Sequence, residues 1–380
     1  MTSGVRLVRM LLCVSALISG VSSVEAGITT IRIDKTEPLA DGAAFGRAGA
    51  YERVTGLARG EVDPRDPRNT GIVNLDKAPR NARGLVEYET DFYLLRPADP
   101  ARGNGRIVYE VNNRGRKLLF GFLLDATTGG NDPRTVADTG TGLLLRLGYT
   151  LAWNGWDPDA PRAGGGLAMR APVATNNGQP IVRMIREEMV SGTRGQPVEI
   201  FTLNYEAATR EPSAARLTVR RKEAQPASEL PSTAWAFVDA RSIRLLPEGT
   251  RPTPGSIYEL HYQAKDPKVL GLGFAATRDF VSFLRYAAAD APGLPNPPAG
   301  TSRRYWPWVS RRAGATCAIT SRRASTRTSR GSVSSTACSP TSREWVAYSS
   351  MPSSASPAAP TPSTRTTSCR RTSSPSRPPS

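Results

Sequence analysis

Two short polar turns in this sequence hold side chains that are suited to binding or catalysis. Asn112–Lys117 follows an apolar run at Ile107–Val111, and Asn154–Pro158 follows a second apolar run at Tyr149–Trp153. Both turns offer amide and charged side chains together with backbone N–H groups. Because ligands of parallel sheets bind at the carboxyl ends of the strands, we expect the turns to form a binding edge. The plainer interpretation is two ordinary polar turns between elements of the fold.

The elements that position these turns make a strand–loop–helix–strand unit. Ile107–Val111 is rich in β-branched and aromatic residues, as is typical of a buried strand. Gly142–Leu147 is predicted to be a helix that ends at Gly148, followed by a strand at Tyr149–Trp153. Such a βαβ unit favours an α/β protein with a parallel sheet. The alternating run Val86–Leu95 is expected to form a hairpin with the strand at 107–111.

A run of oxygen-bearing side chains at Asp63, Asp66 and Asn69 suggests a calcium site. A calcium loop also needs a glycine hinge and a closing glutamate, and neither lies at the required spacing. Both aspartates precede proline, which is typical of turns. We therefore predict a pair of turns here and expect no metal.

Gly271, Gly273 and Ala276 match the G-x-G-x-x-A pattern of dinucleotide-binding loops. That pattern requires a strand leading directly into the glycines, whereas Asp266–Lys268 reads as a turn. Apolar residues recur at helical spacing through Gly273–Ala289. We therefore predict a helix that packs on the core, and we expect no cofactor.

The N-terminus has the pattern of a secretory signal peptide. Arg6 and Arg9 precede the apolar run Met10–Ile18, and a small-residue cleavage site ends at Ala26, before Gly27. An uncleaved anchor is the alternative, although the run is short for a membrane span. Residues 1–26 are thus expected to be a signal peptide on a secreted or periplasmic protein without stable membrane insertion.

The net charge of +17 suggests a nucleic-acid ligand, but the distribution of the charge argues against one. Beyond Gly300 the chain contains thirteen arginines and a single acid, Glu344. Before Gly300 the charges nearly balance, so no basic face is expected on the folded body. We therefore expect no nucleic-acid partner.

Composition divides the chain after the signal peptide into a body at 27–300 and a tail at 301–380. Within the body, residues from about 163 to 262 consist of short apolar runs separated by Gly, Pro, Asn and Ser, which predicts a β-rich insertion. The tail is dominated by Ser, Thr, Arg, Pro and Ala and contains no Leu or Phe. Such a segment buries too little apolar surface to offset its ordering entropy, so we predict a disordered tail.

A slipped reading frame in a GC-rich gene would also produce this tail. When the last base of each codon is joined to the first two of the next, permitted wobble choices let residues 305–328 read L-A-L-G-V-S-Q-S-G-R-Y-L-R-D-Y-L-A-Q-G-F-N-E-D. This string reads as a buried strand, a sharp turn around a serine and an amphipathic helix. Its order is that of the nucleophile elbow of serine hydrolases. We therefore interpret the tail as out of frame.

With this elbow restored, the body resembles a secreted or periplasmic alpha/beta hydrolase domain family whose nucleophile motif is G-[IV]-S-Q-[ST]-G-R. The matching features are Asn113-Arg114-Gly115 after a strand, the Gly148-Tyr149 turn, Gly155-Trp156 and the Asp63–Asn69 run. The resemblance implies that residues 27–300 form the N-terminal part of an incomplete alpha/beta-hydrolase-type parallel sheet. It also implies an esterase-like serine hydrolase, which in intact relatives acts on a small ester-type substrate.

The resemblance further implies that Asn113, Arg114 and Gly115 line the oxyanion loop, although an ordinary polar turn is the alternative. A serine hydrolase also needs a nucleophilic serine and a histidine. In the printed frame Ser310 has no nucleophile motif around it, and the only histidine, His261, precedes the expected nucleophile, against the usual order. We therefore expect an inactive chain with no catalytic residues.

Two other classes of function stay open on the sequence. One is an exported, non-catalytic binding protein with a disordered basic tail. The other is an oxidoreductase that uses the glycines at Gly271 and Gly273.

Overall fold

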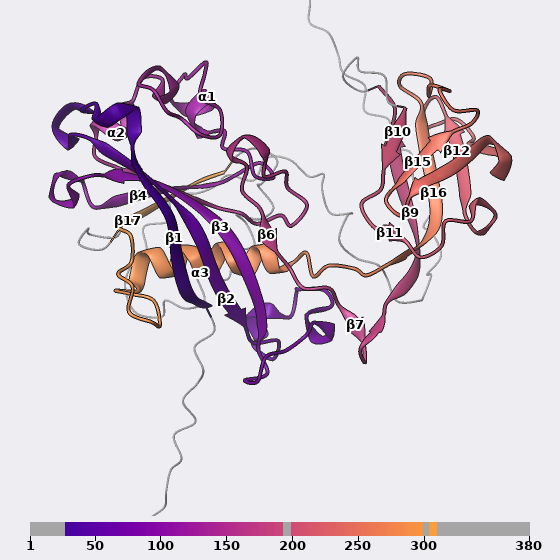
Figure 1. Cartoon of the computed structure of the whole chain (residues 1–380), viewed down its shortest axis with the longest axis horizontal. Helices are drawn as coiled ribbons and strands as arrows, with labels where there is room; N and C mark the ends of the chain where they lie inside the picture. Colours follow the sequence, from indigo (N-terminus) through magenta and orange to yellow (C-terminus); the bar gives the residue numbers. More distant parts are fainter. Residues whose placement is uncertain (1–26, 193–198, 299–303, 310–380) are drawn as a thin grey trace, which may run out of the picture. The chain divides into compact units, whose positions relative to one another are not determined.

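The structure is a computed structural model that describes residues 27–192, 199–298 and 304–309 (Figure 1). The expected signal peptide, and the expected tail apart from 304–309, lie outside these ranges. Within the described part of the chain, no helix is both long and apolar enough to span a membrane.

A seven-stranded mixed sheet forms the larger β-structure. Its strands are β1 (Gly27–Pro38), β2 (Tyr51–Val62), β3 (Val86–Pro97), β4 (Arg106–Val111), β5 (Thr150–Asn154), β6 (Met169–Arg170) and β17 (Arg304–Val309). They run in the order β1-β2-β3-β5-β4-β17, and β6 pairs with β3. The pairs β1/β2, β2/β3, β3/β5 and β3/β6 are antiparallel, whereas β4 is parallel to both β5 and β17.

The predicted fold class is therefore wrong. The described residues are mostly strands in antiparallel or mixed sheets, not an alpha/beta-hydrolase-type parallel sheet flanked by helices. Three α-helices are described, α1 (Leu119–Leu123), α2 (Leu143–Arg146) and α3 (Leu272–Tyr286), and only α3 exceeds five residues. The predicted hairpin is wrong as well, because β5 lies between β3 and β4.

The connections between the first strands explain this outcome. A parallel pair needs a crossover of a dozen or more residues, usually a helix. The segments that join β1 to β2 and β2 to β3 contain only single turns of 3-10 helix, such as Leu39–Gly42 and Leu75–Lys77. The chain therefore reverses at each connection, and β1, β2 and β3 pair antiparallel. The expected helical crossover joins β4 to β5, which are parallel neighbours, and β17, which follows α3 in the chain, is also parallel to β4.

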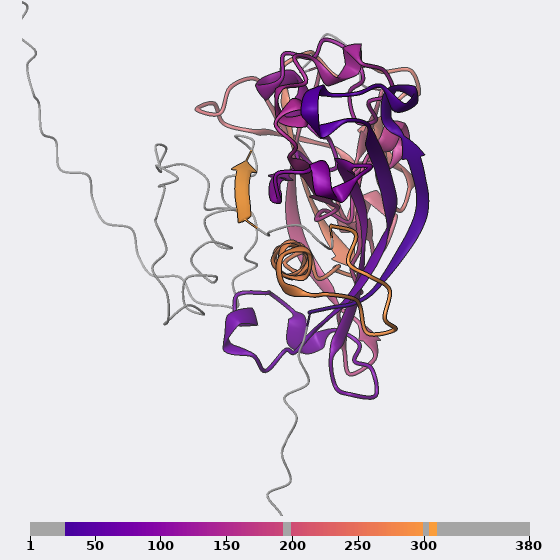
Figure 2. The same cartoon turned by 90° about the vertical axis from the view of Figure 1, so that its left-hand side faces the viewer.

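Alternating side chains of β4 and β5 place a core on each face of this sheet. Val108 and Trp153 pack with Leu119 and Phe120 of α1 on one face. Tyr109 packs with Phe280 of α3 on the other face. Figure 2 shows α3, in orange, lying against one side of the long strands. The predicted helix is confirmed, and its apolar stripe is the surface that meets the sheet.

The segment from about residue 175 to 265 forms smaller antiparallel sheets. The hairpin β7/β8 (Thr175–Asn176, Gln179–Pro180) precedes two sheets that share one apolar core. One sheet contains β9 (Val182–Val190), β11 (Glu206–Ala207), β12 (Arg216–Arg220), β13 (Ser228–Leu230) and β16 (Ile257–Lys265). The other contains β10 (Ile200–Thr202), β14 (Trp235–Asp239) and β15 (Ser242–Leu245). Trp235, Leu260 and Tyr262 are central to the shared core.

Candidate functional site

The turn after β4 is a tight reversal whose backbone conformation is fixed by its neighbours. Asn113 and Arg116 form an antiparallel bridge, and the two residues between them have positive φ, 49° at Arg114 and 84° at Gly115. This is the pattern of a type I′ turn, in which glycine is favoured. A Cβ on Gly115 would lie 2.7 Å from the carbonyl oxygen of Leu167, so the site also requires glycine for space.

A buried network of amides ties this turn to the end of β5. Asn112 donates through Nδ2 to the carbonyl oxygen of Asn154 at 2.7 Å, and Trp156 donates through Nε1 to the carbonyl oxygen of Asn112 at 2.8 Å. Asn154 also accepts from the Tyr109 hydroxyl and donates to Oγ1 of Thr90. Since Asn112 and Asn154 are fully buried, these bonds are needed to satisfy them.

Charge links the same two turns at the surface. Nε of Arg114 donates to Oδ2 of Asp157 at 2.6 Å. The Arg114 side chain is 59% exposed and the Asp157 side chain 11%. The guanidinium of Arg114 is therefore held over this edge while much of it still faces solvent.

The three predicted oxyanion-loop residues differ in what their N–H groups do. The N–H of Asn113 donates to the carbonyl oxygen of Arg116 at 2.9 Å, and that of Gly115 donates to Oδ1 of Asn112 at 2.7 Å. The N–H of Arg116 in turn donates to the carbonyl oxygen of Asn113 at 3.2 Å. Only the N–H of Arg114 has no hydrogen-bond partner among the residues that the structure describes. The turn can thus offer this one donor to an anion.

β17 ends at the same edge as β4. The two strands are parallel and in register from Arg304 opposite Arg106 to Val309 opposite Val111. The chain therefore leaves β17 after Val309 next to the strand that leads into the Asn113–Arg116 turn. The tail prediction covered this segment, and the structure describes a strand in it.

Glu110, which the sequence analysis missed, anchors the loop after the turn. Its carboxylate accepts from Nε1 of Trp153 and from the backbone N–H groups of Leu118 and Leu119. Burial raises the pKa of this carboxyl, while the three donors oppose the rise. A glutamate inside the apolar run Ile107–Val111 was the signal that could have found it.

Lys117 is the second residue that the sequence analysis did not single out as important. Its Nζ donates to the carbonyl oxygens of Asn131 at 2.6 Å and Gly165 at 2.9 Å, and it lies 4.2 Å from the centre of the Tyr93 ring. Burial lowers the pKa of this amine to about 7. Lys117 therefore links the end of the turn to the loops that contain Asn131 and Gly165. The sequence does not indicate this link, because both partners are backbone carbonyl groups far along the chain.

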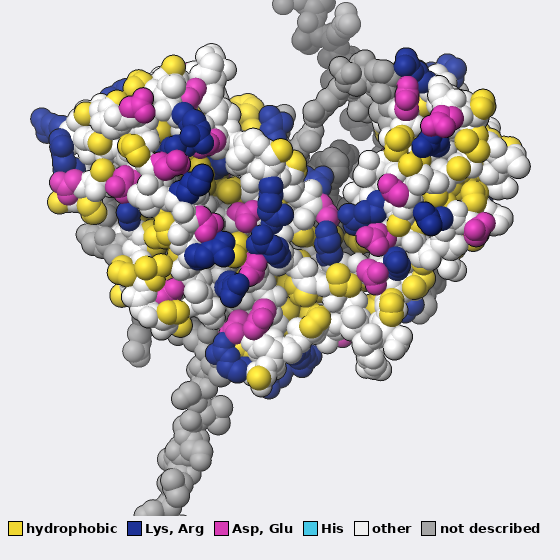
Figure 3. All heavy atoms as spheres, viewed as in Figure 1, with side chains coloured by type: hydrophobic (Ala, Val, Ile, Leu, Met, Phe, Trp, Pro, Cys, Tyr) yellow, Lys and Arg dark blue, Asp and Glu magenta, His cyan; other side chains and the backbone are white. Residues whose placement is uncertain are grey.

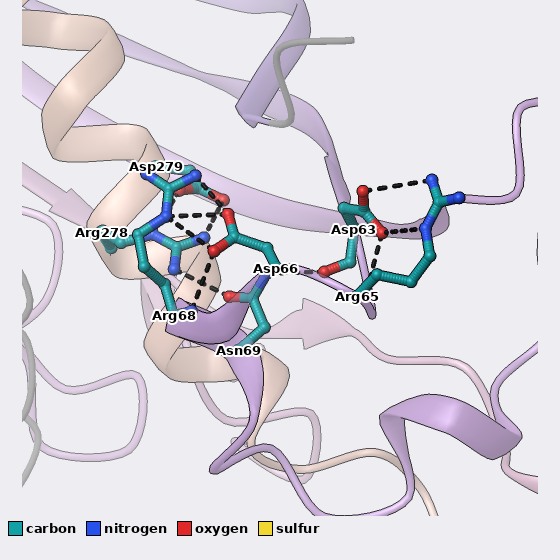
Figure 4. A network of polar contacts seen from close by, with 7 residues as sticks. All are labelled: Asp63, Arg65, Asp66, Arg68, Asn69, Arg278 and Asp279. Atoms are coloured by element: carbon teal, nitrogen blue, oxygen red, sulfur yellow. Dashed lines mark hydrogen bonds and ion pairs between the residues drawn. The ribbon is translucent and has the colours of Figure 1, made fainter. Parts of the chain in front are cut away.

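The Asp63–Asn69 run forms turns whose acids bind arginine (Figure 4). Asp63 pairs with Arg65 and Asp66 with Arg68, and each arginine keeps the pKa of its carboxyl below the usual value. Asn69 accepts from Arg278 of α3 at 2.8 Å, and Arg278 pairs with the buried Asp279. The run therefore joins the β2–β3 connection to α3. Within the described ranges, no cluster of three or more His, Cys, Asp or Glu side chains could hold a metal.

The glycines of the G-x-G-x-x-A pattern serve close packing. A Cβ on Gly273 would lie 2.1 Å from the carbonyl oxygen of Trp156, and one on Gly271 would lie 3.1 Å from the Ile72 side chain. The first turn of α3 is thus filled by protein atoms at the point where a pyrophosphate would have to sit. This geometry gives the oxidoreductase interpretation no support.

His261 lies on β16, opposite Arg216 of β12 and Arg186 of β9. Its Nδ1 atom is buried and has no hydrogen-bond partner in the described structure. A catalytic histidine is normally oriented through this nitrogen by a carboxylate. The geometry therefore gives His261 no feature of a catalytic base.

Charges of both signs lie on the face of the molecule that Figure 3 shows. In Figure 3 the Lys and Arg side chains are interspersed with those of Asp and Glu. Along β3, for example, Glu89 pairs with Arg59 and Arg170, and Asp91 pairs with Arg162. Many of the basic groups are thus locally neutralised by acids.

Comparisons with protein-family models, with curated proteins and with solved structures find no match. The case for a function therefore rests on the residues at the edge where β4, β5 and β17 end.

Proposed function

We propose that this chain derives from an esterase-like serine hydrolase and retains the oxyanion-stabilising turn without the nucleophile. The proposal rests on the local arrangement at one sheet edge and does not depend on the parallel-sheet architecture, which the structure contradicts. In the printed frame the chain is expected to be inactive toward small esters.

The observation that carries the proposal is the position of β17 relative to the Asn113–Arg116 turn. In the reread string, the sixth letter is the serine, which arises from the codons of Ser310 and Arg311. That position follows directly after β17, whose last residue is in register with Val111 of β4. A nucleophile there would leave its strand at the same edge as the open N–H of Arg114, and an oxyanion hole requires such proximity.

The experiment compares the printed chain with a frame-restored chain. One base is added or removed between the codons of Pro298 and Trp308, and hydrolysis of p-nitrophenyl acetate is measured for both proteins. The printed chain should match the rate without enzyme, and the restored chain should turn over ester. Replacing the restored serine with alanine should abolish turnover, and retained turnover in that variant would refute the mechanism.

A second candidate, a non-catalytic binding protein, is favoured by Arg116. This side chain is exposed and forms no ion pair within the described ranges, so it leaves a free cation beside the open N–H of Arg114. Titrating the printed chain with benzoate and following backbone N–H chemical shifts tests this candidate. A saturable shift at Arg114 that the Arg116→Ala variant loses would favour binding, and no shift would exclude it.

We further propose that the protein is exported to a secreted or periplasmic location after cleavage before Gly27. The basic residues, the apolar run and the small residues before Gly27 support this proposal. N-terminal sequencing of the protein from the periplasmic or culture fraction should give Gly27-Ile28-Thr29. Recovery of an uncleaved chain from membranes would contradict this.

A further inference from the structure

β9 is the edge strand of its sheet. One of its sides pairs antiparallel with β16 along its whole length, from Val182 opposite Lys265 to Val190 opposite Ile257. The other side pairs with no strand in the described part of the chain. Such an edge presents a row of backbone N–H and C=O groups that can template another strand.

β9 lacks some of the usual protections of an edge strand, although Arg183, Arg186, Glu187 and Glu188 place charges on it. It contains neither proline nor lysine, and its register with β16 runs without a bulge. Its alternate side chains are exposed and include Met184, which is 57% exposed, and Val190, which is 41% exposed. A long, regular edge with apolar side chains favours pairing with another strand.

Two copies of β9 that run antiparallel can place opposite charges against each other and apolar side chains against each other. Opposite residues of an antiparallel pair lie on the same face of the sheet. A register is therefore permitted only when it keeps the exposed side chains of both copies on one face, and successive permitted registers differ by a shift of two residues. When Glu187 lies opposite its own copy, Arg186 faces Glu188 of the partner subunit and Met184 faces Val190 of the partner subunit. The neighbouring registers bring the exposed Arg186 or the exposed Glu188 against its own copy, and such like-charge pairs are destabilising. In the chosen register the like-charge pair is Glu187 with its own copy, and each of these carboxylates is buried among donors of its own chain.

Intrachain hydrogen bonds and ion pairs already orient Arg186, Glu187 and Glu188, the charged residues at the centre of this register. Glu187 accepts from the N–H and Nδ2 of Asn204 and from the Tyr262 hydroxyl, so its carboxylate is turned toward its own core. Arg186 pairs with Glu259 at 3.2 Å, and Glu188 pairs with Arg220 at 3.5 Å. Pairing of two copies would join these ion pairs into one alternating row.

We propose that β9 pairs antiparallel with β9 of a second copy of this chain, with Glu187 at the two-fold axis. The result is an isologous dimer with one sheet continuous across both copies. This surface lies on β9 and does not depend on the proposed hydrolase ancestry.

The test measures the self-association of the full chain by sedimentation velocity over a range of concentrations. The unaltered chain should dimerise. Arg186→Glu places like charges opposite each other twice per dimer and should weaken association by about ten-fold or more. Combining Arg186→Glu with Glu188→Arg restores opposite charges and should restore the dimer. Arg183→Glu is the matched control, because Arg183 would face Ser191 of the partner subunit and association should hardly change.

Circular dichroism of each variant separates loss of association from loss of folding. If Arg186→Glu fails to fold, a mixture of Arg186→Cys and Glu188→Cys chains is oxidised and its disulfides are mapped by peptide analysis. A bond between residues 186 and 188 of different chains supports the register, and its absence overturns it. A chain that stays monomeric at every concentration, or a folded Arg186→Glu chain that dimerises normally, overturns the proposal.

Discussion

Nε of Arg114 lies 2.6 Å from Oδ2 of Asp157, and this ion pair joins the turn after β4 to the turn after β5. The same turns are joined from beneath by the Asn112 and Trp156 hydrogen bonds. The edge is therefore held by a solvated layer and a buried layer, which should contribute very differently to stability.

The solvated layer should contribute little. Because Arg114 is largely exposed, Arg114→Ala should lower the free energy of unfolding by less than about 1 kcal/mol. Urea denaturation measures this change, with Arg116→Ala as the control that removes an exposed arginine without an ion pair. A loss of more than about 2 kcal/mol for Arg114→Ala alone would mean that the ion pair is a main support of the edge.

The buried layer should contribute more. Asn154→Ala removes the partner of the Tyr109 hydroxyl and of Thr90, and should lower the free energy of unfolding by about 3 kcal/mol. Tyr109→Phe removes the hydroxyl that donates to Asn154 and should cost about 1 kcal/mol. Urea denaturation of both variants and of the double variant should show strong non-additivity. Additive losses in the double variant would count against a shared network.

The sequence predicts local structure here better than it predicts architecture. The apolar stripe of α3 and the parallel neighbours β4 and β5 follow from periodicity in residues close along the chain. The strands β1, β2 and β3 are antiparallel because the segments that connect them form no helical crossover. The resemblance implied a parallel sheet, whereas the segments that join these strands form only 3-10 turns such as Leu39–Gly42.

The candidate site shows the same limit. Polar turns at Asn113–Arg116 and Asn154–Asp157 are visible as breaks after apolar runs, and the structure brings them together. Which N–H is open could not be predicted, because it depends on the positive φ of Arg114 and on hydrogen bonds inside the turn. Lys117 was also beyond prediction, since its two carbonyl partners lie 14 and 48 residues away.

The approach of α3 to the turn after β5 gives a prediction about glycine. Gly273→Ala would place a Cβ 2.1 Å from the carbonyl oxygen of Trp156 and should destabilise the protein by about 2 kcal/mol or more. Gly121→Ala is the matched control in α1, because its Cβ would meet only ordinary contacts beginning at 3.6 Å. The control should be neutral or slightly stabilising, since alanine favours helix. Thermal unfolding of the two variants compares them, and equal melting temperatures would disprove the close approach.

Lys117 gives a prediction about pH. Burial lowers the pKa of its amine from 10.5 to about 7, although Asp132 and Glu110 oppose the change. Between these values the unfolded chain binds a proton that the folded chain lacks, so the free energy of unfolding should rise with pH. The slope should approach about 1.4 kcal/mol per pH unit between about pH 7.5 and 9, below the range where tyrosines ionise. Urea denaturation across this range measures the slope. Lys117→Met should flatten it, and an equal slope in that variant would assign the effect to another group.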